Sequence, residues 1–255
     1  MASTLFTGKV AIVTGAGQGI GFEICKQLAL QGASILLNDV DELLTDVAVD
    51  LIKKDKGNCI GLHGDAGDVT FIQQMADRAV DEFGKIDIVI ANAGITLFAD
   101  FFEYTEDSFN KVMRLNLGGS FFLAQSAAKQ MKTQESGGSI LFMSSVVGHQ
   151  AHKNLAAYAI TKAGLEMLAK NLVIELSPYN INVNAIAPGA TLTERTQHDE
   201  DYEKTWSRIT PLGRPATTRD IANAALFMVS SAARNITGQS LIIDGGWTSV
   251  SPSPY

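Results

Sequence analysis

Short runs of apolar residues alternate along the chain with longer stretches in which apolar positions recur every three or four residues. The short runs have the length and the β-branched content of buried strands, and the longer stretches have the period of amphipathic helices. The pattern predicts strands at 10–13, 34–38, 58–62, 86–91, 139–144, 181–187 and 239–243. It predicts helices at 21–30, 41–54, 70–83, 108–132, 156–176 and 219–230.

Alternation of strands and helices is typical of βαβ units, which build a parallel sheet covered by helices on both faces. The nearly continuous apolar character of the strands agrees with burial on both sides. No linker rich in proline, glycine or serine divides the chain. We therefore expect an α/β fold: a single doubly wound Rossmann-type domain over residues 1–255, with a parallel sheet of about seven strands.

The segment 190–215 departs from this pattern, because it is polar and shows little strand or core-helix character. Long loops of this kind are commonly functional lids. We expect a substrate lid here; the alternative is a solvated excursion without a role.

The overall composition narrows the classes of partner. Hydrophobic residues make up 46% and charged residues 18% of the 255 residues, and the formal net charge is -7. An acidic surface repels nucleic acid, so we expect no nucleic-acid partner. The chain shows no signal peptide and no apolar run long enough for a membrane span. With two cysteines, Cys25 and Cys59, and no disulfide framework, a reduced, cytoplasmic setting is expected.

A glycine-rich segment follows the first predicted strand and precedes the first predicted helix. Gly15, Gly19 and Gly21 stand in the spacing GxxxGxG. Glycines allow positive φ and a close approach of the backbone to a phosphate, and the helix N-terminus offers free N–H groups to the pyrophosphate of a dinucleotide. A plain tight turn is the alternative.

Asp39 ends the second predicted strand, where an acidic side chain can accept hydrogen bonds from the adenosine ribose. A carboxylate there would repel a 2′-phosphate, and Gln18 in the glycine turn provides no cation for one. The sequence therefore favours NAD over NADP as the cofactor. The alternative is that Asp39 only caps the following helix.

Tyr158 and Lys162 are four residues apart on a predicted helix and so share one face. A phenol has a pKa near 10 in peptides, and a nearby ammonium lowers the pKa of a phenol. Such a phenol serves as a general base for an alcohol or a general acid for a carbonyl. Ser145 follows the fifth strand, at the edge where ligands bind in open α/β sheets, and could bind the substrate oxygen. Ser144 is the competing hydroxyl.

Taken together, these motifs resemble the short-chain dehydrogenase/reductase family over nearly the whole chain. The segment 14–21 resembles its TGxxxGxG turn, 92–94 its NAG motif, and 158–162 its YxxxK motif. Asn116, Ser145, the Pro-Gly pair at 188–189 and the Asp-Gly-Gly at 244–246 match further landmarks. The third strand is followed by Asp-Ala rather than the commoner Asp-Val, which weakens only the assignment of Asp65.

The resemblance implies a role for each matching residue. Tyr158 would be the acid/base, Lys162 would support it and bind the nicotinamide ribose, Ser145 would hold the substrate oxygen, and Asn116 would anchor a water in a proton relay. Asp65 would contact the adenine. The residues expected to bind the cofactor are Gly15, Gln18, Gly19, Ile20, Gly21, Asp39, Asp65, Ala66, Asn92, Gly94, Tyr158, Lys162, Pro188, Gly189, Thr191 and Thr193.

The four histidines are scattered, so no metal site is expected. His149 and His152 lie between Ser145 and Tyr158, in a segment that borders the substrate in the family. They are interpreted as ordinary loop histidines, with substrate contact as the alternative. The family also implies a homotetramer or homodimer assembled through the two long helices that contain Asn116 and Tyr158.

Three functions are compatible with these residues. The favoured one is an NAD-dependent dehydrogenase of a sugar, polyol, sugar acid or similar small secondary alcohol. The second is a 3-oxoacyl-[acyl-carrier-protein] reductase, which the sequence also resembles. Asp39, the negative net charge and the sparse basic residues near Lys129 and Lys132 count against it, because such enzymes usually take NADPH and dock an acidic carrier. The third is a cofactor-binding scaffold without turnover, which the complete set of four catalytic residues disfavours.

Overall fold

A parallel sheet lies at the centre of the computed structural model, which describes residues 5–134 and 136–251. Its seven strands run in the order β3-β2-β1-β4-β5-β6-β9. They are β1 (Val10–Val13), β2 (Ser34–Asp39), β3 (Asn58–His63), β4 (Ile88–Ala91), β5 (Gly138–Met143), β6 (Ile181–Pro188) and β9 (Ser240–Ile243). The predicted α/β fold with a seven-stranded parallel sheet is confirmed.

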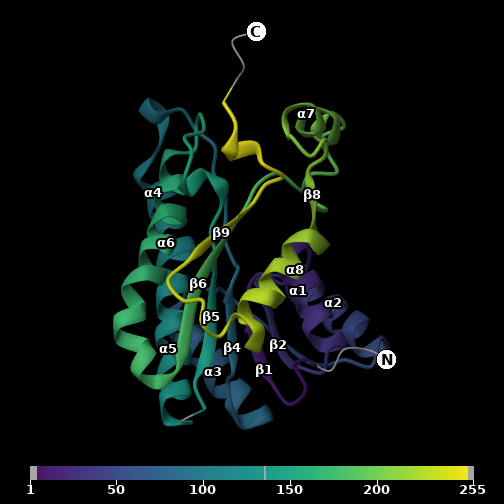
Figure 1. Ribbon diagram of the computed structural model, residues 1–255, viewed down its shortest axis with the longest axis vertical. Coiled ribbons are helices and arrows are strands. Elements are labelled where there is room, and N and C mark those ends of the chain that lie inside the picture. Colours follow the sequence, from purple (N-terminus) through teal and green to yellow (C-terminus); the bar gives the residue numbers. More distant parts are fainter. Residues whose placement is uncertain (1–4, 135, 252–255) are drawn as a thin grey trace.

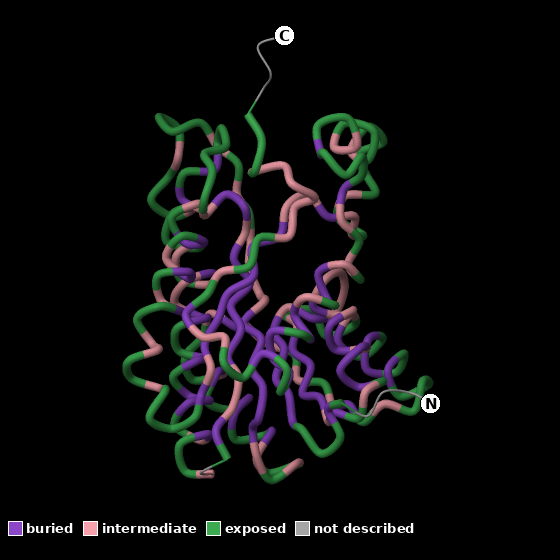
Figure 2. The backbone as a smooth tube through the Cα atoms, in the orientation of Figure 1, coloured by how far each residue is buried: buried purple, intermediate pink, exposed green. Residues whose placement is uncertain are grey.

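Helices cover both faces of the sheet, as Figure 1 shows. One face carries α1 (Gly19–Leu30), α2 (Glu42–Lys54) and α8 (Thr218–Val229). The other carries α3 (Val69–Phe83), α5 (Ser120–Thr133) and α6 (Ala156–Leu176). Successive strand residues point to opposite faces, so Val13 packs into the first core and Ile12 into the second. Both cores are buried around the strands (Figure 2), which explains why the strands are apolar without alternation.

The stretch 108–132, predicted as one helix, is divided in the structure. α4 (Glu106–Val112) and α5 are joined by a π-helical segment, Met113–Gly119. A Cβ on Gly119 would collide with the carbonyl oxygen of Ala66, so the segment passes the loop after β3 at a distance that only glycine allows. Local π-helical turns occur often at functional sites, and this one contains Asn116.

The order of the strands reverses between β1 and β4, which are neighbours in the sheet. From β1 the chain moves outward through β2 and β3, and from β4 it moves the other way through β5, β6 and β9. The crossovers at this point leave on opposite faces, so a crevice opens beyond the carboxyl ends of β1 and β4. The glycine turn and the asparagine of the NAG motif follow these two strands.

The segment 190–215 has more regular structure than the sequence predicted. It contains β7 (Thr191–Leu192) and α7 (Tyr202–Ile209), and β7 pairs in parallel with β8 (Ala216–Thr217). Figure 1 shows α7 standing apart from the main sheet, at the end towards which the described C-terminal part of the chain runs. On α7, Trp206 makes an edge-to-face contact with Trp247, with ring centroids 5.2 Å apart.

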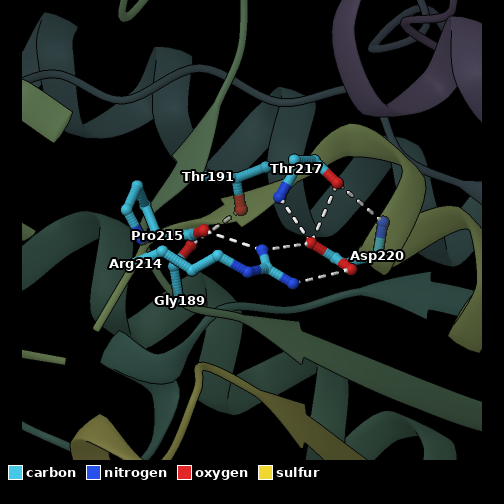
Figure 3. Close-up of polar contacts among 6 residues, drawn as sticks. All are labelled: Gly189, Thr191, Arg214, Pro215, Thr217 and Asp220. Carbon is cyan, nitrogen blue, oxygen red and sulfur yellow. Dashed lines mark hydrogen bonds and ion pairs between the residues drawn. The ribbon is translucent and has the colours of Figure 1, made fainter. Parts of the chain in front are cut away.

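The two stems of this segment are fastened by a polar network, drawn in Figure 3. The guanidinium of Arg214 donates to both carboxylate oxygens of Asp220, at 2.7 and 3.2 Å. Asp220 and Thr217 form a capping box that begins α8. On the other stem, the Thr191 hydroxyl donates to the carbonyl of Gly189 at 3.0 Å. Both ends of the segment 190–215 are therefore hydrogen-bonded to the adjoining domain, at Gly189 and at Asp220.

The remaining elements are short 3₁₀ turns at Phe101–Glu103, Val146–Gly148, Ser177–Tyr179, Ser231–Ala233 and Trp247–Ser249. In the part of the chain that is described, no helix has the length and apolarity needed to cross a bilayer. Cys25 and Cys59 are free and buried. Burial raises the pKa of the Cys59 thiol to about 12, against a smaller lowering by Lys53, which fits a packing role rather than a nucleophile.

Candidate active site

The glycine turn after β1 is shaped by contacts that exclude side chains. Gly15 and Gly19 have φ of +60° and +64°. A Cβ on Gly15 would lie 2.7 Å from the Cα of Ala93, and one on Gly21 would lie 2.5 Å from the carbonyl oxygen of Gly15. All three glycines of the motif are therefore required by conformation or by close packing.

Asn92 holds this turn in place. Its side-chain amide donates to the carbonyls of Thr14 and Gly15, at 2.9 and 2.8 Å. The end of β4 is thus tied to the end of β1, and the turn presents the N-terminus of α1. That N-terminus has no side-chain cap and no acidic residue in its first turn. Its N–H groups are suited to bind the phosphates of a nucleotide.

Asp39 contacts the same turn from β2. Its Oδ2 accepts a hydrogen bond from the backbone N–H of Gly17 at 2.9 Å. The cap of α2 is a different residue, Asp41, whose side chain accepts from the N–H of Leu44. The interpretation of Asp39 as only a helix cap is therefore wrong.

Two neighbouring cavities lie beyond the carboxyl ends of the strands and share Gly15, Asp39, Ala93, Gly94 and Arg195. The first cavity is bordered by most of the residues expected to bind the cofactor or to react: Gly15, Gln18, Gly19, Ile20, Gly21, Asp39, Asn92, Gly94, Ser145, Tyr158, Lys162, Pro188, Gly189, Thr191 and Thr193. The second is bordered by Asp65 and Ala66. The fold thus brings together side chains from six strand ends.

Lys162 is buried beside Tyr158, one turn further along α6. Its ammonium lies 5.3 Å from the centroid of the Tyr158 ring and donates a hydrogen bond to the carbonyl of Met143 at 2.7 Å. Only 3% of Lys162 is exposed, so its charge acts in an environment with little water to screen it. Tyr158, Lys162 and Ser145 border the same cavity.

Asn116 lies behind the cavity rather than at its surface, and it is completely buried. Its side-chain amide exchanges two hydrogen bonds of 2.9 Å with the backbone of Ile95. A Cβ on Gly94 would lie 3.3 Å from Oδ1 of Asn116 and 3.6 Å from Nζ of Lys162. Gly94 therefore lets the asparagine and the lysine approach from the two long helices.

Asp65 borders the second cavity with both carboxylate oxygens already bonded. Oδ1 accepts from the N–H of Gly67 at 2.8 Å, and Oδ2 pairs with Arg114 at 2.7 Å. Burial raises the pKa of Asp65, but the Gly67 hydrogen bond and the Arg114 guanidinium outweigh it and lower the pKa overall. The carboxylate stays ionised and is held rigidly at the cavity edge.

The two serines after β5 differ in their bonding. The Ser144 hydroxyl is within hydrogen-bond distance of the carbonyl of Lys162, at 3.0 Å, and of the Glu166 carboxylate, at 2.6 Å. Ser145 Oγ accepts only a long bond of 3.4 Å from the N–H of Val147 in the described structure. Ser145 is thus the serine whose hydroxyl is available to a substrate.

His149 and His152 are not among the residues that border the two cavities. His149 pairs with Glu166, Nε2 to Oε1, at 2.9 Å. His152 is exposed and contacts the neighbouring carbonyl of Lys153 at 3.1 Å. The described residues hold no group of three or more His, Cys, Asp or Glu side chains arranged as a metal site.

Sequence reasoning missed several residues at the first cavity, namely Thr96, Glu194, Arg195 and Tyr202. Arg195 is the most informative of them, because it borders both cavities. Oε2 of Glu194 lies 3.6 Å from the position of a Cβ on Gly19, at the N-terminus of α1. The polar character of 190–215 was visible in the sequence, but which of its side chains turn inward depends on the path of the chain.

The glycine turn, Asp39 and the pair of Tyr158 and Lys162 lie around one cavity, an arrangement expected of an oxidoreductase that uses a dinucleotide. The comparison with known proteins agrees. The family model described as Enoyl-(Acyl carrier protein) reductase matches residues 15–248. The chain belongs to the short-chain dehydrogenase/reductase family, and it is an oxidoreductase that interconverts alcohols and carbonyl compounds.

Full-length relatives and structures support this assignment. A short-chain dehydrogenase/reductase of Armillaria gallica is 37% identical, over 96% of this chain and 98% of the relative. The L-rhamnose 1-dehydrogenase (NAD(P)(+)) of Azotobacter vinelandii is 35% identical, over 95% and 97%. A structure of a 7α-hydroxysteroid dehydrogenase with NADH and 7-oxo glycochenodeoxycholic acid has a TM-score of 0.91 and 35% identity, with 96% of each chain covered.

Proposed function

We propose that the protein is an NAD(H)-dependent dehydrogenase acting on a small secondary alcohol such as a sugar, a polyol or a sugar acid. The main support for the proposal is the set of residues that border the first cavity. The glycine turn and Asp39 border it together with Ser145, Tyr158 and Lys162. Its other polar residues include Thr96, Thr191 and Tyr202, which suit a hydroxylated substrate. The resemblance to an L-rhamnose 1-dehydrogenase supports the same class.

The residues present fit a dinucleotide, because side chains are excluded where its phosphates would approach the backbone. In the proposed arrangement the α1 N-terminus holds the pyrophosphate and Asp39 holds the adenosine ribose. Asp65 and Ala66 border the adenine end, and Lys162, Pro188, Gly189, Thr191 and Thr193 border the nicotinamide end. When bound, the nicotinamide supplies or accepts the hydride.

The chain's own residues handle the proton and the oxygen. During oxidation, Tyr158 takes the proton of the substrate hydroxyl, and during reduction it returns a proton to the carbonyl oxygen. The Lys162 ammonium lies buried beside the ring of Tyr158, where its positive charge stabilises negative charge that develops on the reacting oxygens. Ser145 donates a hydrogen bond to the substrate oxygen, where charge develops. Asn116 supports the path beyond Lys162 through which the proton reaches water.

NAD is proposed over NADP because the Asp39 carboxylate is fixed at the border of both cavities. It accepts hydrogen bonds from the N–H groups of Gly17 and Asp41, at 2.9 and 3.2 Å. A 2′-phosphate placed there would face this negative charge at short range. Residues 190–215 are proposed as a lid over the cofactor and substrate, within a single domain.

A homotetramer or homodimer is proposed through α4, α5 and α6. These helices expose large apolar side chains in the described monomer: Phe109, Phe121, Phe122, Ile160, Met167 and Ile174. Such a concentration on neighbouring helices is typical of a protein interface. Light scattering after size exclusion tests this, and a purely monomeric species would contradict it.

A bulky apolar alcohol is the second candidate substrate. Phe98, Phe101 and Phe102, in the loop after β4, are 66%, 75% and 91% exposed. Exposed aromatic rings of this kind would favour a steroid-like or acyl substrate over a sugar. The 3-oxoacyl thioesters belong to this group of bulky apolar substrates.

A panel of initial rates tests the proposal. NAD and NADP are offered with sugars, polyols, sugar acids, hydroxysteroids and 3-hydroxyacyl thioesters, and NADH and NADPH with the matching carbonyl compounds. Turnover of a sugar, polyol or sugar acid with NAD is the expected result. Fast reduction of 3-oxoacyl thioesters with NADPH would overturn both the cofactor and the substrate class.

A further inference from the structure

Glu166 is a buried carboxylate on α6, one turn beyond Lys162, and the proposed chemistry does not use it. Only 8% of Glu166 is exposed to solvent. One oxygen, Oε1, is bonded from two directions. The Ser144 hydroxyl lies 2.6 Å away, and Nε2 of His149 lies 2.9 Å away. Burial of an unpaired carboxylate destabilises the folded state, so these two contacts are needed to keep Glu166 buried.

The two partners of Glu166 lie on either side of Ser145. Ser144 immediately precedes it, and His149 follows the 3₁₀ turn Val146–Gly148 that Ser145 caps. That turn is closed by a hydrogen bond of 2.9 Å from the N–H of Gly148 to the carbonyl of Ser145. A single carboxylate oxygen therefore fastens both ends of the segment that presents Ser145.

The packing around Gly148 supports this arrangement. A Cβ on Gly148 would lie 2.9 Å from Oε1 of Glu166 and 3.1 Å from the backbone nitrogen of Ala163. The turn can therefore rest on α6 at this depth only because Gly148 has no side chain. Met143 adds a further tie, because its carbonyl accepts from the Lys162 ammonium at 2.7 Å. Met143 and Ser144, the two residues before Ser145, are thus both hydrogen-bonded to α6.

We propose that Glu166 is a positioning residue, whose carboxylate fixes Ser145 relative to Tyr158 by holding Ser144 and His149 against α6. This inference rests on the proposed function, since it assumes that Ser145 binds the substrate oxygen. Tyr158 and Glu166 belong to one helix, whereas Ser145 belongs to the loop after β5. The distance between the serine and the tyrosine therefore depends on how firmly the loop is attached to the helix, and catalysis is sensitive to small errors in such distances.

The test is a mutant cycle that measures what Ser145 contributes with and without Glu166. The variants are S145A, E166A and the double variant, with E175A as the control because Glu175 is exposed on the same helix. For each, kcat and KM for the alcohol, the Kd for NADH and the Tm are measured. E166Q is added because its amide oxygen still accepts from Ser144, so it should recover part of the activity.

We expect E166A to lower kcat about tenfold with little change in the Kd for NADH, and E175A to behave as the parent protein. The S145A change should lower kcat by about a hundredfold or more in the parent, as for loss of an oxyanion donor. In the E166A background, S145A should lower kcat by a factor about ten times smaller than in the parent protein, because Ser145 is already displaced.

The outcomes distinguish a failure of the proposed role of Glu166 from a failure of the proposed role of Ser145. If S145A lowers kcat by the same factor in both backgrounds, Glu166 does not position Ser145, whatever it does to the Tm. If S145A leaves kcat unchanged in the parent protein, the proposed role of Ser145 is wrong and the inference about Glu166 fails with it. Should E166A not fold, H149Q replaces it in the cycle, because it removes one tie and leaves the buried carboxylate bonded to Ser144.

Discussion

The backbone N–H of Gly17 donates a hydrogen bond of 2.9 Å to Oδ2 of Asp39, which joins the glycine turn after β1 to the end of β2. A Cβ on Gly17 would lie 3.0 Å from that same oxygen and 2.8 Å from the Cβ of Leu44. The glycine turn and Asp39 thus form one unit, with the carboxylate held in a fixed orientation.

Replacement of Asp39 tests the cofactor preference. Asp39→Ala should raise the KM for NAD by roughly ten- to a hundredfold, because hydrogen bonds from hydroxyls to a charged acceptor contribute about 1.5–3 kcal/mol. The same change should narrow the preference for NAD over NADP, since the repulsion of a 2′-phosphate is removed. Steady-state rates with both cofactors measure this.

Asp41 provides the matched control, two residues away. It caps α2 by accepting from the N–H of Leu44 at 3.0 Å. Asp41→Ala should cost about 1 kcal/mol of unfolding free energy, as typical for loss of a helix cap, and leave the NAD/NADP ratio unchanged. A cofactor preference that stays the same in Asp39→Ala would show that the end of β2 does not select the cofactor.

Arg195 should bind the pyrophosphate of the cofactor from the lid. It borders both cavities, and the glycine turn itself contains no cation. Arg195→Met should raise the KM for NAD about tenfold, at the low end for hydrogen bonds to charged groups. It should also weaken the dependence of that KM on ionic strength.

Parallel measurements with NADP separate the two phosphates that Arg195 could reach. Equal losses for NAD and NADP indicate the pyrophosphate, which both cofactors contain. A loss confined to NADP would assign Arg195 to the 2′-phosphate and would contradict the prediction. Arg208→Met, at the end of α7, is the control in the same segment.

Lys162 should affect both cofactor binding and chemistry, because its ammonium lies beside Tyr158 and Lys162 borders the first cavity. Lys162→Met should raise the Kd for NADH and lower kcat by about a hundredfold, the lower bound for a lost contribution to acid–base catalysis. Fluorescence titration and steady-state kinetics measure the two effects. Lys170→Met, exposed on the same helix, is the control. A change in Tm alone would favour a purely structural lysine.

The attachment of the segment 190–215 at Asp220 should weaken in acid. The hydrogen bonds from Arg214 and from the Thr217 N–H hold the pKa of Asp220 well below its ordinary range. A carboxyl with a lowered folded-state pKa contributes stability that is present above its unfolded pKa of about 3.9 and is lost as the pH falls through its folded-state pKa. Below pH 4 the parent protein should therefore progressively lose the contribution of Asp220.

Asp220→Asn removes this contribution at neutral pH. It should lower the Tm at pH 7 and increase proteolysis within 190–215, and the difference in Tm from the parent should shrink as the pH falls below 4. Thermal melts between pH 3 and 7 and limited proteolysis measure the two effects. A difference in Tm that is independent of pH would assign the loss to the helix cap alone.

The sequence predicted the sheet well because the central strands β1, β4, β5 and β6 are buried on both faces and therefore largely apolar. It also indicated which residues lie around one cavity, because Gly15, Asp39, Tyr158 and Lys162 belong to local motifs that follow strands or share a helix face. It did not predict the π-helical turn around Asn116, which depends on the close approach of Gly119 to Ala66. Helical periodicity cannot detect such a turn.

The other omissions also concern tertiary contacts. The sequence pattern does not predict α7, because this short helix lies in a polar segment and its Trp206 packs on Trp247 from the C-terminal part of the chain. The pairing of His149 with Glu166 could not be predicted, because the two residues lie far apart in the sequence, on different elements. The position of Arg195 at both cavities could not be predicted, because it follows from the path of the segment 190–215.

In the proposed mechanism Tyr158 transfers the proton, and the variant Tyr158→Phe tests this role. The ring and its packing beside Lys162 are kept, and only the hydroxyl is removed. The measurement is kcat with the substrate found in the rate panel, together with the Kd for NADH, with Tyr179→Phe as a control. We expect the Kd to stay within about twofold and kcat to fall by at least a hundredfold, the usual minimum for a lost general acid–base. Normal turnover by Tyr158→Phe would contradict the account.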